Sequence, residues 1–412
     1  MNRKITILHT LLGPRELYNS VCYCNRCGLC SSVCPSYQQR PQELFSPRGR
    51  NQALRLILEE KIKPAHVQKQ LTDMLASCSL CGRCSRQCPG AVPTVEHVLA
   101  LKRQLEDGFL PNTLLKLLRL RCTHPRVFSS LVKTGLVLRK TGLMHFLAIK
   151  KDFAWLRHAL AILPKKIPGR VSVHSSKNPN LIYIPSLEAE FLLPNLLAKT
   201  YRLAAKKHRP VVWENTASGL AEYVYGDVRR ARKWVRQLII RHSQLNHGRL
   251  PVLTDSLEVY YFWRQVPQLF EEYPAFQAKA QRFAKKVCFV TDLLPKRLRK
   301  PSQVELPVQG WFTGSFSGED LPYQTALEIL HTLFKKNFVQ CEYEEIAVAF
   351  PSYGFVKHNH ASVYMKQAVQ AMSARQVRTV FVASGLAELE LAFYLRKFYP
   401  TAQACHIVQL NG

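Results

Sequence analysis

Two short cysteine-rich segments constrain this chain more than any other feature. The first, residues 24–35, reads CNRCGLCSSVCP, and the second, residues 78–89, reads CSLCGRCSRQCP. They agree at seven of their twelve positions, and each cysteine of the second segment lies 54 residues after its counterpart in the first. Both follow the pattern C-x-x-C-G-x-C-S-x-x-C-P, so the chain repeats one thiol arrangement.

This spacing is typical of bacterial ferredoxins with two clusters. Three closely spaced cysteines bind one [4Fe-4S] cluster, and the fourth, just before proline, binds the other cluster. The sequence therefore predicts two [4Fe-4S] clusters held by two crossed sets of ligands. The first set is Cys24, Cys27, Cys30 and Cys88, and the second set is Cys78, Cys81, Cys84 and Cys34.

Glycine and proline residues in the two motifs fit this interpretation. Gly28 and Gly82 are expected to supply the permissive backbone angles with which the chain curls closely around a cluster. Pro35 and Pro89 are expected to turn the chain away after the crossing ligand. These positions predict one loop conformation that is used twice.

Zinc sites and disulfides are the alternatives for these thiols. Zinc ribbons usually separate two C-x-x-C pairs by many residues, whereas here three cysteines fall within seven residues. Nine of the thirteen cysteines lie between Cys22 and Cys88, and because we expect no secretory leader, such clustering favours metal over disulfides. Cys22 remains outside the pattern, and we expect a small apolar residue near the cluster there, with a role as an alternate ligand less favoured.

The segment between the motifs predicts helices and not a small β-rich ferredoxin. Apolar residues recur at helical spacing from Arg50, and a second amphipathic helix is expected over residues 64–75 after Pro64.

The order CNRCGLCSSVCP, ELFSPRGR, CSLCGRCSRQCP resembles the iron-sulfur subunit of glycolate oxidase and its relatives, among them the D subunit of heterodisulfide reductase and the C subunit of anaerobic glycerol-3-phosphate dehydrogenase. Arg48 and Arg50 either stabilise anionic clusters or begin a helix as a solvated pair.

After residue 179 the pattern changes to short apolar strands that alternate with helices, which predicts parallel sheets. We therefore expect an α+β protein with an N-terminal alpha-helical ferredoxin domain followed by two α/β lobes. The expected domains are residues 1–108 for the cluster domain, 109–178 for a basic helical linker, 179–300 for the first lobe and 301–412 for the second. Expected strands include NLIYIP, RPVVWE and LPVLTD in the first lobe, and PVQGWFTG, VRTVFVASG and ACHIVQL in the second.

The resemblance implies a Cys-Cys-Gly signature and a later cysteine-containing turn in each lobe, and this chain lacks those cysteines. Alignment by eye places the first signature on NTASG from Asn215 and its later turn from Thr254; the second signature falls on FPSYG from Phe350 and its turn from Ala383. The resemblance thus implies two degenerate lobes that have lost their own metal site. The positions concerned hold Asn215, Ser218, Ser256, Ser352 and Ser384, and the scattered Cys122, Cys288, Cys341 and Cys405 are expected to be ordinary buried cysteines.

The chain is strongly basic, with 58 Lys and Arg against 28 Asp and Glu and a formal net charge of +30. Residues 110–170 contain a single carboxylate, Asp152. Either this stretch forms solvated amphipathic helices, or it docks an acidic partner or an anionic membrane surface; we favour docking. Nucleic acid is disfavoured because the chain has no P-loop, helix-turn-helix or RRM signature.

The sequence predicts an electron-transfer subunit without catalytic residues of its own. A cluster accepts one electron at a time, whereas a substrate such as a 2-hydroxy acid gives up two electrons at once. A flavin in a partner protein must therefore pass the two electrons singly to the clusters. By resemblance, the partner is a FAD-containing oxidoreductase subunit or an electron-transferring flavoprotein, and the acceptor is a quinone or another carrier. The alternative is an accessory subunit that bridges partners, and a disulfide-reducing enzyme is disfavoured. With no apolar run of membrane-spanning length, we expect a cytoplasmic protein, with peripheral attachment at the inner face of the membrane as a second option.

Overall fold

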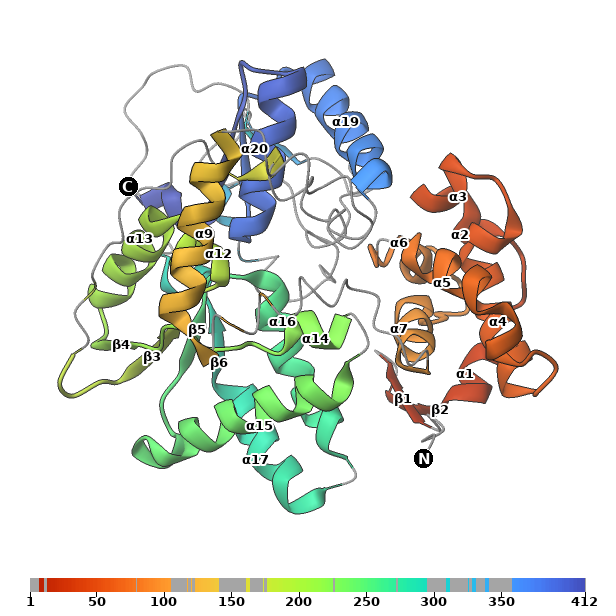
Figure 1. Cartoon of the computed structure of the whole chain (residues 1–412), viewed down its shortest axis with the longest axis horizontal. Coiled ribbons are helices and arrows are strands. Elements are labelled where there is room, and N and C mark those ends of the chain that lie inside the picture. Colours follow the sequence, from red (N-terminus) through yellow and green to blue (C-terminus); the bar gives the residue numbers. More distant parts are fainter. Residues whose placement is uncertain are drawn as a thin grey trace.

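The computed structural model describes residues 7–10, 13–78, 80–104, 123–140, 161–163, 176–224, 227–271, 273–294, 309–311, 328–330, 338–340 and 358–411, with a few single positions between them. Figure 1 shows the N-terminal helices on one side of the molecule and the strands and helices that follow residue 180 on the other. In the described part of the chain, no helix combines the length and the apolar character that crossing a bilayer requires.

The N-terminal region is helical, as predicted, apart from a short antiparallel hairpin of β1 (Ile7–Thr10) and β2 (Gly13–Glu16). The helix expected from Arg50 begins earlier, at Pro47, because the hydroxyl of Ser46 accepts the Gly49 N–H and proline suits the first helical position. The helix expected over residues 64–75 begins as a 3₁₀ turn and becomes α-helical at Gln68. The helices are α1 (Leu17–Cys22), α2 (Leu29–Ser32), α3 (Pro35–Gln39), α4 (Pro47–Leu58), α5 (Gln68–Ala76), α6 (Arg83–Arg86) and α7 (Thr94–Gln104).

A common apolar core holds four of these helices together. It contains Leu17 of α1, Leu54 of α4, Met74 and Leu75 of α5, and Val98 of α7, all of them almost completely buried. Burial of side chains this large stabilises a region by about 1.5–3 kcal/mol each before the entropy cost of ordering the chain. The core therefore fixes α1, α4, α5 and α7 around the two short cysteine-bearing helices.

The rest of the described chain is built on two parallel four-stranded sheets. The first has the strand order β4-β3-β5-β6, and the second has the order β10-β9-β7-β8. The strands are β3 (Leu181–Ile184), β4 (Pro210–Val212), β5 (Val252–Thr254), β6 (Val287–Phe289), β7 (Gln309–Trp311), β8 (Phe338–Gln340), β9 (Thr379–Val382) and β10 (Gln403–His406). The helices are α12 (Leu187–Phe191), α13 (Pro194–Ala205), α14 (Leu220–Val224), α15 (Val228–Gln244), α16 (Leu257–Gln265), α17 (Pro274–Lys286), α19 (His358–Ala374) and α20 (Gly385–Phe398).

Successive side chains of the first sheet enter different cores, as the pleat of a strand requires. Leu181 and Tyr183 of β3 pack with α13 and with residues of the second sheet, whereas Ile182 and Ile184 pack with α15 and α17. The N–H of Leu257 donates to the carbonyl of Ala383 at 3.0 Å, which links the two sheet regions directly. The two sheets therefore share one apolar core.

Helix α14 connects the first sheet to the N-terminal region. Val224 of this helix is buried in the N-terminal core, and Leu220 and Tyr223 pack against both that core and the core under α15. The predicted basic linker, residues 109–178, lies mostly outside the described residues. Its described part includes α9 (Pro125–Lys140), whose Phe128 ring meets that of Phe191 edge-on with centroids 4.9 Å apart.

Candidate iron-sulfur site

The two cysteine motifs adopt the same backbone conformation. Gly28 and Gly82 both have left-handed φ angles, 85° and 72°, and each directly precedes a short helix, α2 or α6. Arg26 and Leu80, two residues earlier, also have positive φ, 56° and 57°. Non-glycine residues adopt this region only at a cost, so its occurrence at matched positions shows that one strained loop is used twice.

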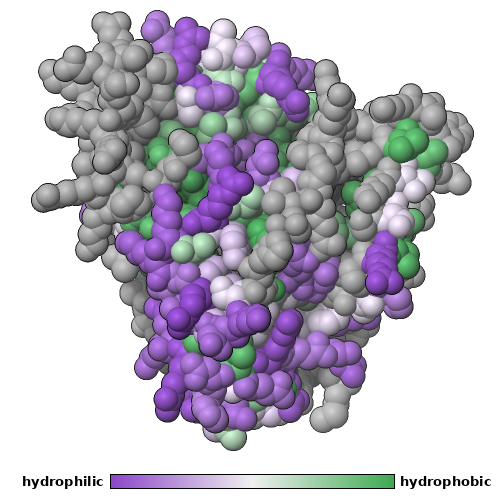
Figure 2. Space-filling view, turned by 90° about the vertical axis from the view of Figure 1, so that its left-hand side faces the viewer, coloured by the Kyte–Doolittle hydropathy of each residue, from purple (hydrophilic) through white to green (hydrophobic). Residues whose placement is uncertain are grey.

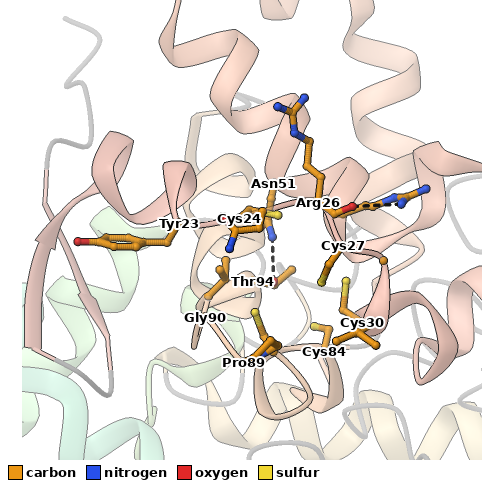
Figure 3. Close-up of a pocket in the computed structure, with 16 residues that line it drawn as sticks. Tyr23, Cys24, Arg26, Cys27, Cys30, Asn51, Cys84, Pro89, Gly90 and Thr94 are labelled. Atoms are coloured by element: carbon orange, nitrogen blue, oxygen red, sulfur yellow. Dashed lines mark hydrogen bonds between the residues drawn. The ribbon is translucent and has the colours of Figure 1, made fainter.

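The first cysteine set surrounds a cavity of about 130 Å³. Cys24, Cys27, Cys30 and Cys88 all line it, together with Cys84 of the second set. Figure 3 shows that the labelled cysteines point toward a common centre, although they come from both motifs. The structure thus brings together the four residues that the spacing predicts for the first cluster; their role as ligands stays a prediction.

The second set lines a smaller cavity. Cys34 of the first motif lies there with Cys78, Cys81 and Cys84 of the second. The cavity is about 20 Å³, smaller than that of the first set. Cys84 lines both cavities, which places the two candidate sites next to each other.

The two sites differ in burial. Cys34 and Cys81 of the second set are buried, whereas Cys27 of the first set is exposed and Cys24 and Cys30 are half-buried. Burial, followed by the nearby Cys24 thiol, raises the pKa of Cys30 to about 11. The first site therefore lies nearer the surface, and any metal that binds there must displace thiol protons.

Arg50 is the polar side chain most closely associated with the second site. It is only 1% exposed, and its Nη1 group donates to the sulfur of Cys34 at 3.8 Å. Its Nη2 group donates to the hydroxyl of Ser77 at 2.8 Å, and its Nε group donates to the carbonyl of Met74 at 3.4 Å. Of the two alternatives for Arg50, the structure excludes a solvated side chain and places a buried cation against a predicted ligand.

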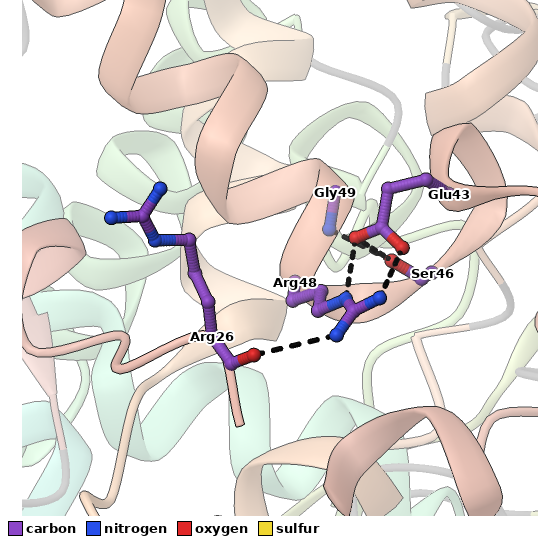
Figure 4. A network of polar contacts seen from close by, with 5 residues as sticks. All are labelled: Arg26, Glu43, Ser46, Arg48 and Gly49. Atoms are coloured by element: carbon purple, nitrogen blue, oxygen red, sulfur yellow. Dashed lines mark hydrogen bonds and ion pairs between the residues drawn. The ribbon is translucent and has the colours of Figure 1, made fainter. Parts of the chain in front are cut away.

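Arg48 occupies a different environment at the rim of the first site. Its Nε and Nη2 groups donate to the two carboxylate oxygens of Glu43 at 2.7 and 2.9 Å, and Nη1 donates to the carbonyl of Arg26 at 3.3 Å (Figure 4). The Arg48 hydrogen bond lowers the pKa of Glu43. Arg48 therefore fixes the strained loop that carries Cys27 while it remains partly in solvent.

A buried polar network that the motifs do not predict joins the helices beside the first site. The ring nitrogens of His97 lie 2.7 Å from the hydroxyl of Ser20 and 2.8 Å from Oδ1 of Asn51. The amide of Asn51 donates to the hydroxyl of Thr94 at 3.1 Å, and burial lowers the pKa of His97 to about 3. A neutral imidazole thus ties α1, α4 and the first turn of α7 together, and Asn51 and Thr94 line the first cavity.

The other cysteines lie elsewhere. Cys22 is exposed at the end of α1 and lines neither cavity, and its expected lack of a ligand role stays a prediction. Cys288 in β6 and Cys405 in β10 are half-buried and not fully buried as expected. Cys122 and Cys341 fall outside the described residues. Within the described ranges, no three His, Cys, Asp or Glu side chains are grouped closely enough to hold a single metal ion.

Positions aligned with the lost signatures have structural roles in the sheets. Ser256 and Ser384 are the N-caps of α16 and α20, and their hydroxyls accept the N–H groups of Val259 and Ala387. Asn215 has a positive φ of 55°, and its N–H donates to the carboxylate of Glu190 at 3.1 Å. Ser352 lies outside the described residues. At the positions that are described, serine and asparagine therefore support turns and helix ends.

Buried carboxyl groups lie where the two sheet regions meet. The hydroxyl of Tyr183 donates to Asp255 at 2.6 Å, and the hydroxyl of Ser256 donates to Glu258 at 2.9 Å. Burial raises the pKa of Asp255 to about 6, and it raises those of Glu258 and Glu388 to about 7. These carboxyls hold protons at a higher pH than exposed ones do.

The donor chemistry of the two cavities fits iron-sulfur clusters. Thiolate sulfur is the soft ligand that such clusters use, and each cavity gathers cysteines from both motifs. In a cubane each thiolate binds a different iron atom, so its ligands surround a wider volume than those of one zinc ion. The buried guanidinium beside Cys34 also suits an anionic group.

Comparisons with known proteins agree with this interpretation over the N-terminal region. Residues 20–92 match the family model of a 4Fe-4S dicluster domain, so this region contains such a domain and [4Fe-4S] clusters are its cofactors. The chain is also 33% identical over 121 residues to the glycolate oxidase iron-sulfur subunit of Escherichia coli strain K12, which confirms the predicted resemblance there. That match covers 28% of this chain and 28% of the relative, and no solved structure matches the chain.

Proposed function

We propose that this chain is an electron-transfer subunit that passes single electrons through two [4Fe-4S] clusters between a flavoprotein and a quinone or another carrier. The observation that carries the proposal is the pair of adjacent cavities, each lined by cysteines of both motifs and sharing Cys84. A [4Fe-4S] cluster supplies one-electron chemistry when it is bound. Two neighbouring clusters would give electrons a short path through the N-terminal region.

The eight proposed ligands form the two crossed sets. Cys24, Cys27, Cys30 and Cys88 would hold the cluster nearer the surface, and Cys78, Cys81, Cys84 and Cys34 would hold the buried one. Arg50 would donate a hydrogen bond to Cys34 of the buried set and would compensate the negative charge of the cluster there. This positive neighbour would favour the reduced form of that cluster. Arg48 would hold the loop around Cys27 in place.

The proposed partner is a FAD-containing oxidoreductase subunit or an electron-transferring flavoprotein. The name of the relative, an iron-sulfur subunit of an oxidase, supports a separate subunit that oxidises the substrate. A flavin accepts two electrons and releases them one at a time, which is what one-electron acceptors require. The proposed location is the cytoplasm or the inner face of the membrane.

A second candidate is an accessory subunit whose sheets bridge other proteins. The observation that favours it is the replacement of the lost signature positions by helix caps, at Ser256 and Ser384. We propose that the two sheets belong to two degenerate lobes, residues 179–300 and 301–412, that follow the cluster domain of residues 1–108 and the linker of residues 109–178. Both candidates keep the clusters, and they differ in whether electrons pass through them.

Anaerobic purification followed by analysis of iron, sulfide and zinc tests the cluster content. We expect about 8 iron and about 8 sulfide per chain and essentially no zinc. Stopped-flow mixing with a flavoprotein that co-purifies from the native host then tests electron transfer. Cluster bleaching that follows flavin reduction would support the electron carrier, whereas full clusters that stay oxidised beside a reduced flavin would favour the accessory subunit. A zinc-loaded, iron-free protein would exclude both.

A further inference from the structure

One surface outside the cysteine sites stands out for its charge. We call it the basic face, and it consists of the outward sides of α15 and α17. Exposed basic side chains from both helices form it: Arg229, Lys233, Arg236, Lys279, Arg282 and Lys285. Neither helix contains an aspartate or glutamate within its bounds. Such a concentration of one sign of charge attracts anions and repels other basic surfaces.

The packing of the first sheet explains why these side chains face outward. The inner sides of the two helices are apolar: Val235 and Leu238 of α15 and Phe283 of α17 are buried against β3 and β5. The other side of the same sheet is covered by α13 and by residues of the second sheet, and the basic side chains on the outward sides of α15 and α17 are exposed. Figure 1 shows both helices at the lower edge of the molecule, and Figure 2 shows hydrophilic side chains gathered over that lower part.

Aromatic and apolar side chains accompany the charges. The guanidinium of Arg236 lies 5.4 Å from the ring centre of Phe276, and that of Arg232 lies 5.6 Å from the ring centre of Tyr273. Tyr273 is itself 46% exposed, and Ile240 of α15 is 39% exposed. Arginines supported by rings present donors that match phosphate oxygens, and exposed Tyr and Ile side chains can enter the region between lipid headgroups and acyl chains.

We propose that the basic face docks this protein on an anionic lipid bilayer, with α15 and α17 lying along the headgroups. A bilayer fits better than an acidic protein, because the face spreads one sign of charge over two helices and adds exposed apolar residues. Each basic side chain near an anionic membrane contributes about 1 kcal/mol, so several acting together are sufficient for reversible binding. The proposal uses no residue of the cluster region and is independent of the proposed electron transfer.

Vesicle sedimentation with the full-length, cluster-loaded protein tests the proposal. We expect binding to vesicles of phosphatidylcholine mixed with phosphatidylglycerol, no binding to phosphatidylcholine alone, and release as salt is raised to about 0.5 M. In the test variant, four exposed residues of the basic face become glutamine: Lys233→Gln, Arg236→Gln, Arg282→Gln and Lys285→Gln. Its affinity for the anionic vesicles should fall by about 1,000-fold, since each of the four side chains contributes about 1 kcal/mol.

The matched control removes the same charge from the opposite side of the first sheet. It combines four exposed changes at and after the end of α13: Arg202→Gln, Lys206→Gln, Lys207→Gln and Arg209→Gln. The control should bind anionic vesicles within about 3-fold of the wild type, and both variants should keep the wild-type iron content and thermal midpoint. Equal loss of binding in both variants would show that binding depends on the net charge of the protein and not on the basic face. Absence of binding by the wild type, or displacement from vesicles by an equal charge of duplex oligonucleotide, would overturn the proposal.

Discussion

The cysteine region and the sheet region both contain repeated elements, yet they use the repeated positions differently. In the cysteine region, Gly28 and Gly82 turn the chain in the same way, and thiols from both repeats line shared cavities. In the sheet region, Ser256 and Ser384 cap equivalent helices. The repeated positions of the cysteine region therefore line cavities, whereas those of the sheet region support local backbone structure.

The difference has a physical basis in how each region is stabilised. The sheets bury large apolar side chains such as Trp263, Phe283 and Phe289 completely or almost completely, so they need no cofactor to close their core. The cysteine motifs are short loops and single-turn helices, and in the first set Cys27 is exposed and Cys24 is half-buried. A ligand that joins both motifs stabilises them in proportion to its affinity for the folded form. We therefore expect the two regions to respond very differently to the following changes.

The largest expected effect is that of Cys88→Ser. Cys88 belongs to the second motif but lines the cavity of the first set, so its loss should damage the cluster held by Cys24, Cys27 and Cys30. Iron content should fall by about 4 per chain, to about half of the wild-type value. Electron paramagnetic resonance of the reduced protein should show which of the two cluster signals disappears.

Cys22→Ser is the matched control, because Cys22 lies two residues before the first motif and lines neither cavity. This variant should keep the wild-type iron content. If Cys88→Ser spared the signal assigned to the first set and removed only the other, the crossed assignment of ligands would be wrong. If Cys22→Ser lost iron to the same extent, Cys22 would have to be counted among the ligands.

The sequence predicts the cysteine region well because its geometry is local. The spacing of the cysteines and the two glycines is sufficient to predict the repeated loop, including the left-handed residues that the structure shows at Gly28 and Gly82. The environment of Arg50 could not be predicted, because its burial depends on contacts with Met74 and Ser77, more than twenty residues away. The network of His97 was missed for the same reason, since no motif marks its partners.

In the sheet region, the predicted strands that the structure describes are present, but several boundaries and two strands, β6 and β8, were missed. The segment between β3 and β4 contains two helices, because Pro194 begins a new helix at α13. Strand β6 has only three residues and follows α17 directly. Its sequence therefore shows neither the alternation of apolar and polar residues nor the preceding turn residues that would predict a strand. Short buried strands of this kind are defined by their partners in the sheet and not by their own sequence.

The next largest effect is expected for Arg50→Met in the cysteine region. Methionine has a similar length but cannot donate to Cys34, Met74 and Ser77, so the variant leaves buried acceptors without their donor. We expect the free energy of unfolding to fall by about 3 kcal/mol or more. The reduction potential of the second cluster should also become more negative, because a positive neighbour no longer favours the added electron.

Arg48→Met is the comparison for this variant. Arg48 is partly exposed and its pair with Glu43 is solvated, so its loss should cost less than about 1 kcal/mol. Potentiometric titration and chemical unfolding of both variants give the two measurements. Equal effects at the two positions would show that burial of Arg50 contributes nothing specific to the second site.

In the sheet region, the corresponding test is the pH dependence of stability. Glu258 has a pKa of about 7 in the folded protein, raised by burial from 4.5, so the folded state retains a proton that the unfolded state loses. Stability should therefore fall as pH rises from about 4.5 to about 7, by about 3 kcal/mol from this group, and the full cost should persist above pH 7. Glu258→Gln should remove that part of the pH dependence and make the protein more stable at pH 8. Urea unfolding followed by tryptophan fluorescence measures this, and an unchanged pH profile in the variant would contradict the assignment.

The smallest effect, and the sharpest test of the comparison, is expected at Ser384. The Ser384 hydroxyl accepts the N–H of Ala387 at 3.2 Å and caps a fourteen-residue helix, so Ser384→Ala should cost about 1 kcal/mol of stability and no iron. Ser384→Cys should lose the cap in the same way and still bind no additional iron, because one thiol among carboxyl and hydroxyl groups is not a cluster site. The measurement is urea unfolding together with the iron content of anaerobically reconstituted protein. If Ser384→Cys raised the iron content above that of the wild type, the sheet region would have kept a metal site that the structure presents as a helix cap, and the contrast between the two regions would fail.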